Sequence, residues 1–261
     1  MYLNIIIGMS SLPAKDELRA AIASIIDEDD GMKLFSADFT LERYLIANKL
    51  DVSKSLSGIK ETAKWRQSAI IPGFVCELCR MKPGSHCFIS LGLDAGGSTL
   101  IYGCPARASE GGEVEATMAH CVNTLEKQWG EVTGPSPPQD WVWMVDFRGF
   151  GVSHALQARL GMSFASIFRS HFPERLKSII LLNPPILFKA LVAAIGAVAD
   201  ARTLAKLKVV VAPDHELCEK LKSEFGVNDP EVLAWLNTAF STPPTPGSLP
   251  PLPKHLEHLQ V

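Results

Sequence analysis

Apolar residues recur at helical spacing through the first seventy residues of the chain. Leu18, Ile22 and Ile25 follow one another at steps of four and three, and the run 52–63 repeats this rhythm. Such spacing places apolar side chains on one face of a helix. The rhythm stops at residues 70–73, Ile-Ile-Pro-Gly, because proline lacks the amide donor and glycine costs helix stability. We therefore expect an N-terminal helical region over residues 1–72.

Beyond this boundary, short apolar runs alternate with longer helical stretches. Strands are expected at residues 88–93, 100–104, 141–145, 179–182 and 209–211, and helices at 113–129 and 156–172. Strands and helices that alternate at these lengths are typical of an α/β domain with a mostly parallel central sheet. We assign this domain to residues 73–228, and residues 229–261 to a C-terminal helix and a proline-rich tail.

The proline-rich part of the tail covers residues 241–253. Its sequence, STPPTPGSLPPLP, has too many prolines for a helix or a central strand. We expect an extended arm here, which could serve as a docking segment for a protein partner.

Composition excludes several classes of protein. The 261 residues are 47% hydrophobic and 20% charged, which is enough for a large core. A formal net charge of -3 without a long run of basic residues argues against a nucleic-acid partner. The six cysteines are scattered and no convincing secretory signal precedes them, which favours reduced thiols and a cytoplasmic location. The apolar segment 179–199 is interrupted by Asn183, Pro184, Pro185 and Lys189, so a buried strand followed by an apolar helix is favoured over a membrane span.

Motifs of common catalytic and nucleotide-binding sites are missing from the sequence. There is no GxSxG, GxxxxGK[ST] or HExxH motif, and no GxGxxG that opens a helix. We therefore expect no catalytic residues, no cofactor and no enzymatic activity. A small-molecule hydrolase remains an alternative that would need an acid, a base and a nucleophile in one cleft.

One group of cysteine and histidine residues could bind a metal. Cys76 and Cys79 form a C-x-x-C pair, and His86 and Cys87 follow it. A single C-x-x-C without a second paired spacing is a weak zinc signal. Apolar packing of buried thiols is the favoured interpretation, so no metal is expected.

Several segments together resemble the CRAL-TRIO lipid-binding family, in particular its phosphatidylinositol transfer branch. Residues 41–52, LERYLIANKLDV, and 64–66, KWR, are similar to the family's N-terminal signature. Residues 146–149, DFRG, resemble its D-x-[KR]-G segment. Residues 171–177, HFPERLK, followed by Asn183-Pro184-Pro185 and Phe188, match a further family motif in order and spacing.

The resemblance implies an apolar lipid pocket in the α/β domain and a site for an inositol phosphate headgroup. The implied headgroup residues are Lys49, Glu174, Arg175, Asp200, Thr203 and Lys206. Their chemistry suits this ligand, because ammonium and hydroxyl groups donate to phosphate and a carboxylate accepts from inositol hydroxyls. Taken singly, each also has an ordinary structural interpretation, such as a solvated ion pair or a turn.

The segment 186–199, ILFKALVAAIGAVA, lies where the family has a gating helix. It is apolar nearly all round, so it would tolerate both an acyl pocket and a bilayer surface, although core packing would explain it too. The implied pocket and gate residues are Phe164, Phe168, Leu187, Phe188, Leu191, Val192 and Ile195. The expected function is binding of a phospholipid, most simply phosphatidylinositol, with transfer or presentation at a transiently contacted membrane.

Two departures from the family pattern leave alternatives open. Residues 141–144, WVWM, stand where choline-lipid binding members have small hydroxyl residues, which argues against phosphatidylcholine. The family's closing segment has no counterpart before the proline-rich tail. A different hydrophobic ligand, such as a retinoid or tocopherol, and a ligand-free protein-interaction scaffold are the other interpretations.

Overall fold

The computed structural model describes residues 2–25, 35, 37–109, 113–129, 140–155, 158–186 and 201–261. The chain divides into two compact units. Unit 1 comprises Met1–Ile71 and Ile167–Arg175, and unit 2 comprises Pro72–Ser166 and Leu176–Val261. Within the described ranges, no helix has both the length and the apolar character needed to cross a membrane.

Unit 1 is helical, as its apolar spacing predicts. It contains α1 (Tyr2–Ala23), α2 (Asp38–Ala47) and α3 (Val52–Ala69). The side chain of Asp51 caps α3 by accepting a hydrogen bond from the Lys54 amide at 2.9 Å. The apolar faces of the three helices share a buried cluster whose members include Leu18, Ile22, Leu41, Leu45 and Ile59.

Unit 2 contains a mostly parallel sheet, which confirms the predicted α/β class. Its strands are β1 (Phe88–Leu93), β2 (Thr99–Gly103), β3 (Trp141–Asp146), β4 (Leu176–Leu182) and β5 (Leu207–Val210). They lie in the order β1-β2-β3-β4-β5, with β1 antiparallel to β2 and the other pairs parallel. The carboxyl ends of β2 to β5 therefore share one edge of the sheet, where ligands bind in open α/β sheets.

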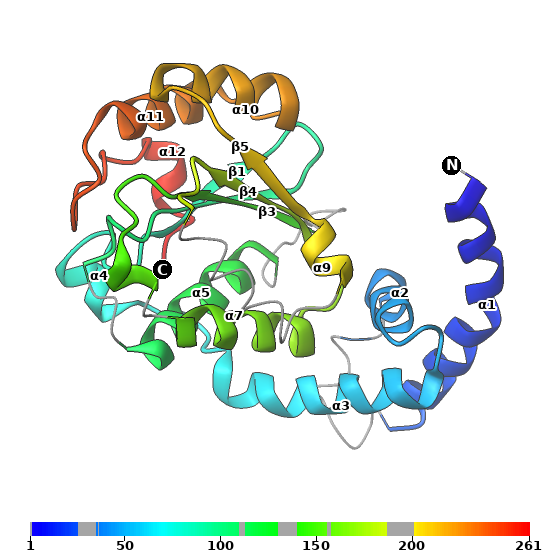
Figure 1. The fold of residues 1–261 in the computed structure, drawn as a ribbon. Coiled ribbons are helices and arrows are strands. Elements are labelled where there is room, and N and C mark those ends of the chain that lie inside the picture. The colour runs from blue at the N-terminus through cyan, green and yellow to red at the C-terminus, as the bar shows by residue number, and fades with distance from the viewer. Residues whose placement is uncertain are drawn as a thin grey trace. The chain divides into compact units, whose positions relative to one another are not determined.

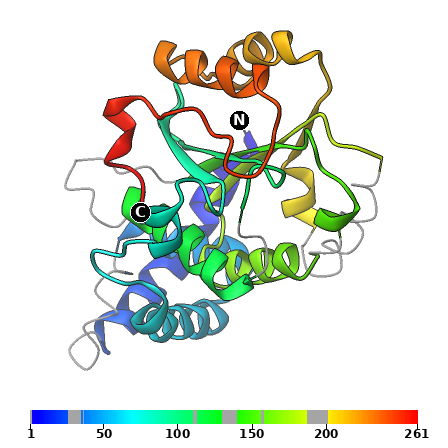
Figure 2. The same ribbon diagram turned by 90° about the vertical axis from the view of Figure 1, so that its left-hand side faces the viewer.

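Helices flank both faces of this sheet (Figure 1). On one side lie α10 (Leu217–Phe225) and α11 (Pro230–Ser241), and on the other lie α5 (Val114–Trp129) and the first turns of α7 (Ala158–His171). The view turned by 90° shows the same separation (Figure 2). The remaining described helices are short: α4 (Glu77–Met81), α6 (Val152–Ala155), α9 (Ala201–Ala205), α12 (Lys254–Glu257) and a 3-10 turn at Asp214–Glu216.

The face of the sheet that carries Val142 and Met144, here called face A, is closed by the C-terminal helices. These two side chains belong to a buried cluster with Trp235, Leu236 and Phe240 of α11. Successive residues of a strand point to opposite faces, so Trp141, Trp143 and Val145 belong to the other side, face B. Face A is thus a filled hydrophobic core.

Two arginines hold the carboxyl end of α11. Arg107 is fully buried and donates to the carbonyl oxygens of Ala239 at 2.6 Å and Thr242 at 2.8 Å. Arg148 donates to the carbonyl of Ala239 at 3.0 Å and pairs with the buried Asp146 at 2.7 Å. A cation at this position is favoured because the last carbonyls of a helix are unpaired and carry partial negative charge. Asp146 and Arg148 of the DFRG segment thus have a structural role at the end of α11.

The proline-rich tail packs along unit 2. The carbonyl and hydroxyl oxygens of Ser248 both accept from Arg107, and the Pro250 carbonyl accepts from the Trp235 indole at 3.1 Å. Beyond the prolines, Leu256 of α12 is buried in the face A cluster, and Gln260 donates to the Ser90 carbonyl at 2.9 Å. Part of the tail's hydrogen-bonding capacity is therefore used within the unit.

Candidate functional site

Face B carries a wall of aromatic rings. Trp143 of β3 stacks on Phe164 of α7 with centroids 4.5 Å apart, and Trp141 lies 5.9 Å from Trp143. Phe88 of β1 joins this wall at 5.7 Å from Trp143 and 6.0 Å from Phe164. The wall presents large apolar area together with the polarisable faces of aromatic rings. Phe164 was a predicted pocket residue, whereas Phe88 and the two tryptophans were not.

Face B is closed at Val145 of β3 and Leu181 of β4, which are 6% and 3% exposed, and is most open at the edge strand β5. Trp141 is 1% exposed, whereas Trp143, Ile179 and Leu207 are only partly buried. Val209 on the edge strand β5 is 62% exposed. On face A, the strand residues of the apolar cluster, among them Val142, Met144 and Leu182, are all buried.

The indole of Trp143 adds one polar group to the wall. Its Nε1 is buried and has no hydrogen-bond partner among the described residues. Gly103 of the neighbouring strand makes room for it, because a Cβ at that position would lie 2.9 Å from Nε1. A buried N–H without an acceptor is costly, so the close packing of the wall comes here with the loss of one hydrogen bond.

The end of β4 is fixed by the asparagine of the predicted family motif. Asn183 has a positive φ of 49°, and its side-chain amide donates to the Ala212 carbonyl at 2.9 Å. Its side-chain oxygen accepts from the Ala212 amide at 3.0 Å. This paired bond joins the ends of β4 and β5. It therefore sets the point at which the chain leaves the sheet.

Three predicted headgroup residues belong to unit 1. Lys49 follows α2 with a φ of 55°, and Glu174 lies in the turn after α7 with a φ of 56°. Arg175 follows it, with its guanidinium carbon 6.0 Å from the centroid of the Phe39 ring. Phe168, a predicted pocket residue, stacks on Phe172 at 4.9 Å in the same unit. Left-handed backbone at Lys49 and Glu174 is uncommon for residues with side chains and is often associated with functional turns.

The other predicted headgroup residues follow the gate segment in the sequence. Thr203 lies in α9, and Lys206 is half-buried directly before β5, where its carbonyl accepts from the Ile179 amide at 3.0 Å. Both belong to unit 2. Asp200 and the predicted gate residues Leu187, Phe188, Leu191, Val192 and Ile195 lie outside the described residues. The headgroup set as a whole stays a prediction.

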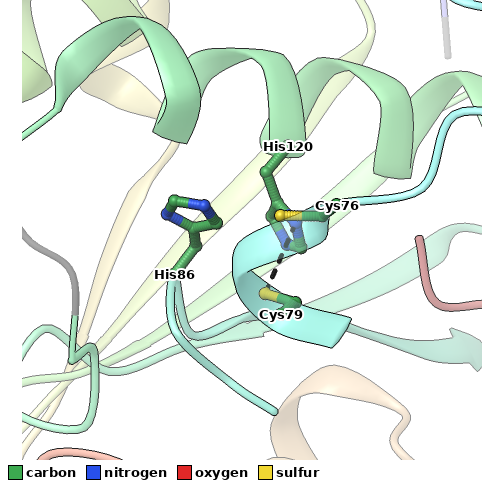
Figure 3. A group of neighbouring side chains, drawn as sticks. All are labelled: Cys76, Cys79, His86 and His120. Atoms are coloured by element: carbon green, nitrogen blue, oxygen red, sulfur yellow. Dashed lines mark hydrogen bonds between the residues drawn. The ribbon is translucent and has the colours of Figure 1, made fainter. Parts of the chain in front are cut away.

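The cysteine and histidine group differs from the set suggested by the sequence. Cys76, Cys79 and His86 come together with His120 of α5, and one ligand atom from each lies within 4.8 Å of the others (Figure 3). Cys87 instead belongs to the apolar cluster of face A. No spacing signal points to His120, because it lies 34 positions after His86 in the sequence and the helix α5 brings it back to the group.

Burial favours the neutral forms of His120 and Cys79. Loss of hydration lowers the pKa of His120 to about 4, although a hydrogen bond to the Phe88 carbonyl acts in the opposite direction. Burial raises the pKa of the Cys79 thiol to about 11, and the neighbouring Cys76 adds to this effect. Both groups are therefore neutral near pH 7.

Comparison with known proteins agrees with this architecture. A family model for the CRAL/TRIO domain matches residues 84–228. The crystal structure of Sfh5 is similar to this chain, with a TM-score of 0.61 over 84% of this chain and 86% of that chain at 17% sequence identity. At this identity the likeness concerns the fold alone. A comparison with curated proteins gives no significant match.

Proposed function

Because the chain belongs to the CRAL/TRIO domain family of lipid-binding proteins, we propose that it binds a membrane phospholipid and that this phospholipid is phosphatidylinositol. We propose further that it transfers this lipid between membranes or presents it at one. The observation that carries the proposal is the contrast between the two faces of the sheet. Face A is a closed core, whereas face B combines an aromatic wall with partly buried apolar side chains and the exposed Val209 of β5.

Face B is the proposed surface for the acyl chains, with the segment 186–199 as its gate. A two-chain lipid has on the order of 30 methylenes, each worth about 0.8 kcal/mol on burial, so its release into water would cost over about 20 kcal/mol. The bilayer offers the chains an equally apolar environment. Exchange is therefore favourable only at a membrane, and the headgroup contacts decide which lipid is retained.

The proposed headgroup site contains Lys49, Glu174, Arg175, Asp200, Thr203 and Lys206. Cationic side chains would neutralise the phosphate, and Glu174 would accept hydrogen bonds from inositol hydroxyls. Each charge-assisted hydrogen bond contributes about 1.5 to 3 kcal/mol, so the loss of one is enough to change lipid preference about tenfold or more.

Exposed apolar residues near the carboxyl edge of the sheet support transient contact with a membrane. Ile186 after β4 is 86% exposed, and Val211 directly after β5 is 72% exposed. Together with Val209, they place apolar surface at the edge where the chain leaves the sheet for the gate segment. Such surface could enter the boundary between headgroups and acyl chains.

A ligand with a single polar group, such as a retinoid or tocopherol, is the second candidate. The aromatic wall of face B favours it, because the pockets of such ligands are lined mostly by apolar and aromatic side chains. This alternative predicts little effect from changes at Lys206 or Glu174.

The test is mass spectrometry of lipids extracted from the purified chain after incubation with mixed-lipid vesicles. Glu174→Ala and Lys206→Ala are compared with Glu219→Ala and Lys208→Ala, whose side chains are exposed. Phosphatidylinositol that is bound by the unaltered chain and both controls, and lost from both test variants, would support the proposed headgroup site.

The other outcomes separate the alternatives. A different hydrophobic ligand that is retained by all four variants would refute the headgroup site and favour the second candidate. If the unaltered chain extracts no lipid from the vesicles, lipid binding itself is refuted, and an interaction scaffold becomes the better interpretation.

A further inference from the structure

Four metal-ligating side chains from separate segments of unit 2 converge beside the edge strand β1. Cys76 directly precedes α4 and Cys79 lies within it, while His86 precedes β1 and His120 comes from α5 (Figure 3). One ligand atom from each residue lies within 4.8 Å of the other three. We propose that these four side chains form a tetrahedral Zn²⁺ site.

The separations between the ligand atoms are close to those that zinc requires. Zn–S bonds of about 2.3 Å and Zn–N bonds of about 2.0 to 2.1 Å place tetrahedral ligands about 3.3 to 3.8 Å apart. Cys79 Sγ and His120 Nδ1 are 3.8 Å apart. The rings of His86 and His120 are tilted by 41° with centroids 4.9 Å apart, so they approach from different directions. A contraction of about 1 to 1.5 Å at the widest pair completes the coordination sphere.

The surroundings orient His120 for coordination. Its Nε2 lies 3.1 Å from the Phe88 carbonyl, which can only accept, so Nε2 carries the proton and Nδ1 keeps its lone pair. Nδ1 is also the nitrogen that contacts Cys79 Sγ. Ligating histidines commonly donate their second ring N–H to a carbonyl in this way.

The other histidine also has a supporting contact. His86 Nδ1 lies 3.2 Å from the Thr117 hydroxyl, which makes Nε2 the ligating nitrogen in the proposed site. The thiolate is the form of cysteine that binds a metal, so Cys76 and Cys79 would bind the ion as thiolates.

The charge and type of the ligands select zinc. Two thiolates and two neutral imidazoles balance the charge of a divalent ion, which matters because Cys76, His86 and His120 are only 5%, 8% and 4% exposed. Magnesium and calcium prefer oxygen ligands, whereas sulfur and imidazole together suit Zn²⁺. Because the protein fills all four positions, the ion would be structural.

The proposed ion would brace the aromatic wall of face B. It would join α4 to α5 through ligands 41 residues apart in the sequence. Phe88 accepts a hydrogen bond from one ligand, His120, while its ring packs against Trp141 and Phe164 at 6.0 Å. The ion would thus fix the β1 end of the wall without touching a bound lipid.

The test uses the untagged full chain, purified under reducing conditions without chelator. Elemental analysis should give about one zinc ion per chain. Replacement of this ion by Co²⁺ should produce the intense visible absorption of tetrahedral cobalt and a sulfur-to-cobalt charge-transfer band. A reduced, folded chain that binds neither metal, or an octahedral cobalt spectrum, would overturn the proposal.

Variants assign the ligands. Cys79→Ser and His120→Gln should each lower bound zinc by about tenfold or more. Cys87→Ala is the control, since it removes a buried thiol next to His86, and it should retain the ion. Zinc retained by both test variants would place the ion elsewhere. A Cys76–Cys79 disulfide in the freshly purified chain, detected by thiol counting, would instead assign the pair to redox chemistry. Far-ultraviolet circular dichroism checks that each variant is folded, and the cobalt spectrum of the unaltered chain needs no variant.

Discussion

Replacement of Arg107 by methionine tests how strongly the tail is fastened to unit 2. The arginine is fully buried and donates to the carbonyl and hydroxyl of Ser248 and to the carbonyls of Ala239 and Thr242. Methionine retains much of the side-chain volume but none of the donors. The Ala239 carbonyl keeps its bond from Arg148 at 3.0 Å, so the Ser248 and Thr242 carbonyls lose the most.

The expected loss of stability follows from these unmade hydrogen bonds. Each buried acceptor left without a partner costs about 1 to 3 kcal/mol, and loss of the charge at the end of α11 costs up to about 1 kcal/mol more. We expect the free energy of unfolding of unit 2 to fall by about 3 to 5 kcal/mol. This is a large fraction of the stability of an ordinary domain.

Urea unfolding followed by tryptophan fluorescence measures this loss, because Trp141, Trp143 and Trp235 all lie in unit 2. The control is Arg159→Met, which changes an exposed arginine and should cost less than about 1 kcal/mol. Limited proteolysis should also cut the tail of the Arg107 variant faster. A loss below about 1 kcal/mol would refute the view that Arg107 fastens the tail.

Three further predictions concern single residues. Burial lowers the pKa of His171 below its ordinary value of 6.5, against the opposite effect of Glu61, so the unfolded chain binds the proton more readily than the folded chain. The contribution of the neutral His171 to the free energy of unfolding should therefore be fully present above about pH 6.5 and decrease at lower pH. His171→Phe should reduce this decrease, measured as the difference between urea midpoints at pH 5 and pH 7.5. Asp229 caps α11 by accepting from the Glu231 and Val232 amides, so Asp229→Ala should cost about 1 kcal/mol in urea unfolding while Asp229→Asn retains the cap; equal losses in both would contradict this role. Phe164→Ala on face B should lower the amount of lipid extracted from vesicles at a modest cost in stability. Phe240→Ala on face A should instead lower the free energy of unfolding by about 3 to 5 kcal/mol without lowering the lipid bound per folded chain. The reverse pattern would place the ligand against face A.

The strands and long helices could be predicted because their signal is local. The runs around Phe88 and Trp141 are apolar over a whole strand and end at turn residues, so periodicity locates them within one or two residues. The edge strand β5 is the weakest case. It begins at Leu207 instead of residue 209, and its Val209 is 62% exposed.

Contacts between distant parts of the chain could not be predicted. Arg107 binds acceptors 132 to 141 residues away, and no local pattern distinguishes it from a surface arginine. His120 joins the two cysteines only because α5 returns to the β1 edge, so the sequence suggested the neighbouring Cys87 in its place. The headgroup residues come from resemblance to a family, which carries information that periodicity and spacing lack.

The closure of face A by the C-terminal helices has a consequence for the order of folding during synthesis. The five strands of the described sheet have been made once Val210 is added, but the residues that cover face A extend to Leu256 and Gln260. Some fifty residues of translation therefore separate a complete set of strands from a complete core, counted from Val210 to Gln260. During this interval the apolar side chains of face A, Met144 and Leu182 among them, have no cover. The nascent chain is then a substrate for chaperones that bind exposed apolar surface.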